Sequence, residues 1–237
     1  MQTTLSTTSA ERSPSSRTSL ALALWLVVAG LQVAAAFMLG AGKTGSKAGE
    51  NEPLYEYSLA IGSIFLYGIL AGVTFWIASL FPDRIAALGL RRFSPRVLWV
   101  VAGVVIASLV VSGVLEPELH AGREQGLEPD RWRPDRAAPF FLNALLIVTL
   151  VPFAEELFYR GLGIRVLQIF GSLVAAVSTA LVFGLAHGIL VALPALGFFG
   201  LCLAWLRVRT ESVWPGVIAH AFYNGLGIAA FFATSTS

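Results

Sequence analysis

The stretch that decides the fold runs from Leu173 to Leu206 and reads LVAAVSTALVFGLAHGILVALPALGFFGLCLAWL. Its only Asp, Glu, Lys, Arg or His residue is His187. The stretch is longer than one crossing of a bilayer, for which about 20 apolar residues suffice. Because backbone amides inside lipid must be hydrogen-bonded internally, such a run predicts α-helices. We divide it into two spans, with a break near Gly188 to Pro194.

The rest of the chain has the same character. Of its 237 residues, 56% are hydrophobic and 13% are charged, whereas soluble domains carry about 25% charged residues. Further spans are expected over residues 19–40, 57–81, 97–115, 138–158 and 213–233. The sequence therefore predicts an all-α fold, a polytopic transmembrane helical bundle of about seven spans. Cys202 is the only cysteine, which excludes an intrachain disulfide and a cysteine metal cluster.

Three regions are expected along the chain. Residues 1–18 are rich in Ser and Thr and are expected to form a disordered tail. Residues 19–137 would hold the N-terminal transmembrane helices and loops, and residues 138–233 the catalytic core helices. The first apolar stretch exceeds the roughly 7–15 residues of a signal-peptide core. We therefore expect a signal anchor, with cleavage after this stretch as the alternative.

Basic residues predict the orientation in the membrane. Arginines cluster before the first span and after the second, fourth and sixth: Arg12, Arg17, Arg84, Arg91, Arg92, Arg96, Arg160, Arg165, Arg207 and Arg209. Because cytoplasmic loops carry an excess of Lys and Arg, this places the N-terminus in the cytoplasm. We expect an integral protein of the plasma membrane. Simple alternation would separate Glu155 from His187, so we expect residues 161–172 to form a helix along the membrane interface.

Charged residues in the segment VPFAEELFYRG, residues 151–161, indicate a functional site. An ionisable side chain inside a span costs about 2.5–3.5 kcal/mol on insertion scales. Glu156 and Arg160 are four residues apart and share a helix face, which predicts an ion pair. Glu155 points about 100° away and lacks that partner, so it is a candidate for chemistry. The alternative is that all three snorkel at the helix end.

Two further pairs share helix faces. His220 and Asn224 present an imidazole and an amide that can donate hydrogen bonds to an oxyanion. Phe183 would form an apolar wall beside His187. A carboxylate, two imidazoles and an amide make a hydrolytic set, because the carboxylate can take a proton from water. The alternative for these pairs is ordinary contact between helices.

Three motifs occur in order: EELFYR from Glu155, FGLAH from Phe183 and HAFYN from His220. Together they resemble the CPBP family, the type II CAAX prenyl endopeptidases and their bacterial relatives, also called Abi proteins. The resemblance implies an intramembrane endopeptidase whose site lies in a cavity between helices. In that family pattern Glu155 and His187 activate the attacking water, and His220 and Asn224 form the oxyanion hole. Glu156 and Arg160 support the site.

The implied partners are a peptide or membrane-protein substrate and the lipid bilayer, and nucleic acid is not expected. No cofactor is favoured. A zinc-dependent protease is the nearest alternative, with Glu155, His187 and His220 as ligands, although the chain has no HExxH motif. Another alternative is a non-catalytic binding, immunity or scaffold protein of the same fold. The complete set of four polar residues favours the enzyme.

Overall fold

All regular structure in the described residues, 15–41, 52–119 and 131–235 of this computed structural model, is helical. The longer helices are α1 (Ser16–Ala41), α2 (Tyr57–Ala78), α4 (Val97–Leu119), α6 (Ala137–Val148), α9 (Ser172–Leu185), α10 (Leu193–Thr210) and α11 (Trp214–Ser235). The shorter ones are η1 (Pro53–Tyr55), α3 (Arg84–Ala87), η2 (Pro134–Arg136), α7 (Leu150–Glu155), η3 (Glu156–Gly163), α8 (Ile164–Leu167), η4 (Gln168–Phe170) and η5 (Leu190–Ala192). The predicted all-α class is confirmed.

Six stretches of the described chain are long and apolar enough to cross a bilayer. They are Ser16–Met38, Tyr57–Ala78, Val97–Leu115, Pro134–Phe170, Leu190–Thr210 and Trp214–Ala233. The apolar helix α9 is shorter and makes the seventh of the predicted set. The predicted break near Gly188 to Pro194 falls between α9 and α10. Of the tail expected over residues 1–18, residues 1–14 lie outside the described chain, and α1 begins at Ser16.

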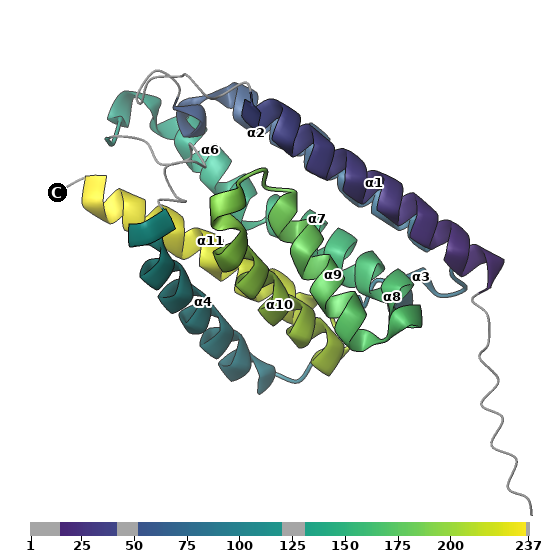
Figure 1. Cartoon of the computed structure of the whole chain (residues 1–237). Coiled ribbons are helices and arrows are strands. Elements are labelled where there is room, and N and C mark those ends of the chain that lie inside the picture. The colour runs from purple at the N-terminus through teal and green to yellow at the C-terminus, as the bar shows by residue number, and fades with distance from the viewer. Residues whose placement is uncertain (1–14, 42–51, 120–130, 236–237) are drawn as a thin grey trace, which may run out of the picture.

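The stretch from α6 through η4 passes through the middle of the bundle (Figure 1). Helices α1 and α2 cover one side of it, and α10 and α11 cover the other. Helix α4 lies outside, against α10 and α11. Large apolar side chains on the outer surface are exposed, for example Phe65, Trp99 and Leu173. Exposed apolar area of this extent indicates contact with lipid.

The fourth span continues further than the sequence suggested. We expected it to end near residue 158, followed by an interfacial helix over 161–172, but one helical stretch runs from Pro134 to Phe170. Residues 161–164 are buried. A Cβ atom on Gly163 would lie 2.9 Å from Cζ2 of Trp25, so α1 packs directly on this segment. The helix is therefore core structure here, and Glu155 lies near its middle.

Helix α9 has 14 residues, which corresponds to a length of about 21 Å. The hydrocarbon core of a bilayer is about 30 Å thick, so α9 crosses only part of it. The chain turns at Gly188, whose φ of 72° suits glycine, and returns through η5 and α10. His187 therefore lies within the bundle rather than at the far surface. This removes the predicted separation between His187 and Glu155.

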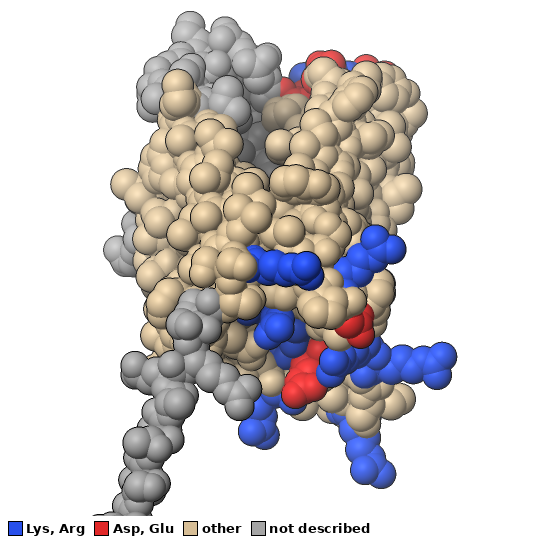
Figure 2. Space-filling view, turned by 90° about the vertical axis from the view of Figure 1, so that its right-hand side faces the viewer, with Lys and Arg blue, Asp and Glu red and all other residues tan. Residues whose placement is uncertain are grey.

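Basic residues gather at one end of the molecule, below a wide band without charged side chains (Figure 2). The arginines that sequence analysis placed on one side include Arg91, Arg165 and Arg207, and these three line a common pocket. The apolar helices and the charged end describe an integral membrane protein. The choice of membrane and the cytoplasmic N-terminus stay predictions from the arginine pattern.

Candidate active site

The two glutamates lie in the helical stretch Pro134–Phe170, here called the central helix, at the point where α-helical geometry changes to π-helical geometry. Glu155 ends α7, and Glu156 begins η3, a π-helical segment of 8 residues. Both side chains are buried, and Glu156 has no exposed surface. A π-helix is rare, since its i→i+5 hydrogen bonds are less favourable, and it occurs often at functional sites. The local winding thus places two adjacent carboxylates inside the bundle.

The predicted ion pair between Glu156 and Arg160 forms. Nη1 of Arg160 donates to Oε1 of Glu156 at 2.9 Å, and both side chains are completely buried. Nη2 of Arg160 donates to the carbonyl of Gly200 on α10 at 3.1 Å. The guanidinium also lies 4.4 Å from the ring centre of Phe183. Arg160 therefore fastens the π-helical segment to α9 and α10, and neither residue snorkels at a helix end.

His220 of α11 lies between the two glutamates. Its Nδ1 is 3.3 Å from Oε1 of Glu156, and its Nε2 is 3.8 Å from Oε2 of Glu155. Because a carboxylate accepts hydrogen bonds, Glu156 favours a proton on Nδ1 of His220. Glu156 thus does more than neutralise Arg160: it also orients the imidazole that faces Glu155.

Glu155 has a partner that sequence analysis missed. The hydroxyl of Tyr67 on α2 donates to Oε1 of Glu155 at 3.2 Å. In the described chain, Oε2 of Glu155 is buried and has no hydrogen bond. One signal was available: Tyr67 lies in the middle of its span, whereas tyrosines of membrane helices gather at the interfaces. The carboxylate that we expected to be unpaired is held through one oxygen only.

His187 and Phe183 pack together as their spacing predicts. Their ring centres are 4.8 Å apart, and Phe183 also contacts the ring of His220 at 5.7 Å. Nδ1 of His187 lies 2.8 Å from the carbonyl of Phe183. Since a carbonyl can only accept, Nδ1 carries the proton, and Nε2 of the neutral ring is a free acceptor. The Phe183 ring therefore packs against both imidazole rings.

Asn224 is turned toward a different element. Its Nδ2 donates to the carbonyl of Ile147 on α6 at 3.0 Å. The chain leaves helical geometry two residues later, at Thr149, with φ −124° and ψ −72°. One amide hydrogen therefore supports the junction between α6 and α7. In the described structure Asn224 makes no hydrogen bond to Glu155, Glu156 or His220, and it keeps a second amide hydrogen.

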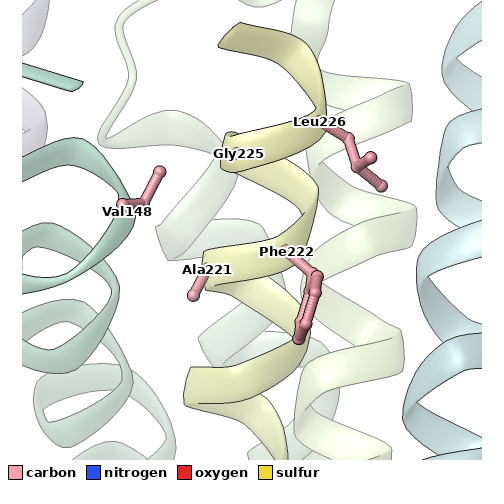
Figure 3. A pocket seen from close by; sticks show the side chains of 5 residues that line it. All are labelled: Val148, Ala221, Phe222, Gly225 and Leu226. Atoms are coloured by element: carbon pink, nitrogen blue, oxygen red, sulfur yellow. The ribbon is translucent and has the colours of Figure 1, made fainter. Parts of the chain in front are cut away.

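An apolar groove of about 390 Å³ opens beside these residues, between α6 and α11. Figure 3 shows its lining: Ala221 lies on the side of α11 toward Val148, whereas the side chains of Phe222 and Leu226 point away from Val148, and Gly225 completes the set. Ala221 and Gly225 directly follow His220 and Asn224 in the chain. The groove therefore borders the helix that carries His220 and Asn224, and its lining includes neither of them.

The C-terminal half of the chain matches a known family. Residues 137–226 fit the family model described as Type II CAAX prenyl endopeptidase Rce1-like. This segment is therefore similar to that family. No curated protein and no solved structure matches the chain. The match confirms the predicted resemblance, and it covers most of the range 138–233 in which we expected the catalytic core.

The matched residues 137–226 include every site residue that the sequence indicated, from Glu155 to Asn224. Tyr67 lies outside this range, on α2. Within the described chain no three His, Cys, Asp or Glu side chains are grouped so as to hold a metal ion. The proposed zinc ligands Glu155, His187 and His220 therefore do not form a set as they stand. We derive no step through zinc.

Tyr67→Phe should lower the rate of any hydrolysis that Glu155 catalyses by about tenfold to a hundredfold. A hydrogen bond to a charged group contributes about 1.5–3 kcal/mol, and each 1.4 kcal/mol is about a factor of ten. Because Tyr67 holds Glu155, we expect the loss in kcat with KM unchanged. Tyr57→Phe is the control, since that side chain is 53% exposed on the same helix. Equal kcat for both variants would contradict a positioning role.

Gly216→Ala should destabilise the protein by about 1–3 kcal/mol, the usual cost of overpacking. A Cβ atom at Gly216 would lie 2.6 Å from Oε2 of Glu156, whose side chain is completely buried and paired with Arg160. Gly227→Ala is a matched control on the same helix, because no atom lies within 4 Å of its Cβ position. Thermal unfolding in detergent micelles measures both. If the two variants unfold together, Glu156 is not confined by α11.

Proposed function

We propose that the protein is an intramembrane endopeptidase that hydrolyses peptide bonds with a water molecule activated by Glu155. The observation that carries this proposal is the state of Glu155: one oxygen is held by Tyr67, and the other is buried, without a hydrogen bond, 3.8 Å from Nε2 of His220. A buried carboxylate held through one oxygen can accept a proton through the other. The endopeptidase family of residues 137–226 gives independent support.

The attacking water would bind between Glu155 and His187. Oε2 of Glu155 takes one water proton, and Nε2 of His187 accepts a hydrogen bond from the other water hydrogen. The His187 tautomer supports this role, because Nδ1 donates to the Phe183 carbonyl and leaves Nε2 as an acceptor. The hydroxide then attacks the carbonyl carbon of the scissile bond. Glu155 returns the proton to the leaving amine, as a general base that becomes a general acid does.

His220 and Asn224 would stabilise the oxyanion of the tetrahedral intermediate. His220 is oriented by Glu156 through Nδ1, so Nε2 is the nitrogen available to the substrate. Donation from Nε2 while Nδ1 donates to Glu156 requires a proton on both ring nitrogens. Asn224 can contribute the amide hydrogen that Ile147 does not take. Preorganised donors of this kind contribute about 2.7–4 kcal/mol each.

The substrate is a peptide or a membrane protein. Its apolar segment would enter through the groove between α6 and α11, whose lining is made of apolar residues and Gly225. We propose that the protein lies in the plasma membrane with its N-terminus in the cytoplasm, and the arginines at one end of the bundle support this orientation.

Peptide profiling of membranes tests the proposal. Membranes that carry wild-type protein, Glu155→Ala or His187→Ala are compared for peptides that accumulate uncut. We expect the same uncut species with both variants and not with wild type. If both variants match wild type in every assay where deletion of the gene has a phenotype, the protease proposal fails. This outcome would favour the non-catalytic binding or scaffold protein.

Chelation separates the glutamate mechanism from a zinc-dependent one. We expect purified protein to keep its activity after treatment with a zinc chelator and to contain no stoichiometric zinc. Activity that is lost on chelation and restored by zinc would replace the proposed mechanism. In that case Glu155, His187 and His220 would have to converge on the metal from three helices.

A further inference from the structure

A polar pocket of about 410 Å³ lies at the arginine-rich end of the bundle. It is bordered by the segment around α3 and by the ends of the central helix and α10. Its polar lining consists of Asp83, Arg91, Arg165, Gln168, Arg207 and Glu211. The proposed peptidase chemistry uses none of these residues.

Both acids of the pocket already have partners. The carboxylate of Asp83 accepts from the backbone N–H of Ala86 at 3.0 Å and so caps α3. Oε2 of Glu211 pairs with Nη1 of Arg91 at 3.2 Å. Among the described residues the other two arginines, Arg165 and Arg207, form no ion pair, and Arg207 has only the electrostatic attraction of Glu211, which is already paired with Arg91.

Arg207 is a buried cation that makes no ion pair among the described residues, although the nearby carboxylate of Glu211 attracts it. Its side chain is 8% exposed, and in the described chain its Nε has no hydrogen-bond partner. The guanidinium packs directly on Gly89, because a Cβ atom at that position would lie only 2.6 Å from Nε of Arg207. No ion pair among the described residues includes Arg207 or Arg165. Burying a charge without a partner is costly, so a bound anion would offset the burial of Arg207.

Arg165 and its surroundings indicate the kind of anion. The Arg165 guanidinium lies 5.0 Å from the ring centre of Phe81, which also lines the pocket. Paired guanidinium groups suit phosphate oxygens, because each presents a planar fork of donors. Nearby Phe170 and Leu173 are 57% and 77% exposed and continue the lipid-facing surface. Basic pockets between membrane helices bind phosphate head groups in this way.

We propose that this pocket binds a phosphate-bearing anion, with Arg165 and Arg207 donating to its oxygens. The anion can be supplied as a lipid head group or as free phosphate, and the chemistry of recognition is the same. The proposal is independent of the peptidase function, because it uses different residues at a different level of the bundle.

Lipid retention and thermal unfolding test the proposal on the full-length protein. Purified protein is reconstituted in vesicles of phosphatidylcholine alone or of equal parts phosphatidylcholine and phosphatidylglycerol. Retained lipid is then counted by native mass spectrometry. A parallel arm titrates inorganic phosphate in detergent without lipid. We expect retention of phosphatidylglycerol by wild type if the source is lipid, or a phosphate-dependent rise in unfolding temperature if the source is free phosphate.

Arg165→Gln and Arg207→Gln should each weaken the binding seen in either arm by about tenfold, the usual loss for one charge-assisted hydrogen bond. Arg165 is exposed, so its variant is expected to fold even if Arg207→Gln does not. Arg209→Gln, an exposed site on the same helix as Arg207, is the control and should bind as wild type does. Binding of neither probe, or equal binding by Arg165→Gln and Arg209→Gln, overturns the proposal.

Discussion

Glu155→Gln is expected to lower kcat/KM for peptide hydrolysis by about 10²- to 10⁴-fold, the contribution of a positioned general base. The amide has the size of the carboxylate, and its oxygen can still accept from Tyr67, which now donates at 3.2 Å. It cannot take a proton from water. We therefore expect the rate to fall while the unfolding temperature stays close to that of wild type. Initial rates on purified protein, with a substrate found by peptide profiling, measure the effect.

Two comparisons make this prediction specific. Glu211→Gln removes an exposed carboxylate that directly follows α10 and pairs with Arg91. The rate of peptide hydrolysis by this variant should equal that of wild type. The double variant Glu155→Gln/His187→Ala should lose little more than Glu155→Gln alone, since residues that act on one water are not additive. A Glu155→Gln protein with the wild-type kcat/KM would exclude Glu155 as the base.

The parts of the site that were predictable from sequence are the local ones. Glu156 and Arg160 are four residues apart, and this spacing alone indicates the buried pair that forms. The contact between Phe183 and His187 follows from the same rule. Such pairs need only one helix, so they do not depend on how helices pack.

Contacts between distant segments were not predictable. Tyr67 and Glu155 are separated by 88 residues, and α2 is apolar around its whole circumference, so no periodicity shows which face meets the carboxylate. Asn224 shares a face with His220 as expected, yet its amide donates to the carbonyl of Ile147, which lies just before irregular backbone. The sequence indicates the two donors, His220 and Asn224, but it does not indicate that the carbonyl of Ile147 accepts from the Asn224 amide.

The length of the central helix was misjudged for a related reason. The segment after Arg160 alternates apolar residues with Gly161, Gly163 and Arg165, a composition that also suits an interfacial helix. Packing decides between the two. Nε1 of Trp25 on α1 donates to the carbonyl of Phe158 at 3.0 Å, and Gly163 allows the indole to lie against the helix. A single helix's pattern does not contain that information.

Arg160→Ala should destabilise the protein by about 3–5 kcal/mol, the cost of removing one partner from a buried ion pair. Three consequences combine: Glu156 keeps a buried charge, the carbonyl of Gly200 loses its donor, and Phe183 loses the cation above its ring. Chemical unfolding in mixed micelles measures the loss. Arg209→Ala is the control, because that arginine is exposed, and it should change stability by less than about 0.5 kcal/mol.

The double variant Glu156→Leu/Arg160→Leu distinguishes the pair's two tasks. Replacing both buried charges by apolar side chains is often neutral or stabilising, so the double variant should be more stable than Arg160→Ala. Its activity should nevertheless remain low, because His220 then loses the carboxylate that orients Nδ1 at 3.3 Å. Recovery of both stability and activity would show that the pair only fills space. Recovery of stability alone would assign Glu156 to the orientation of His220.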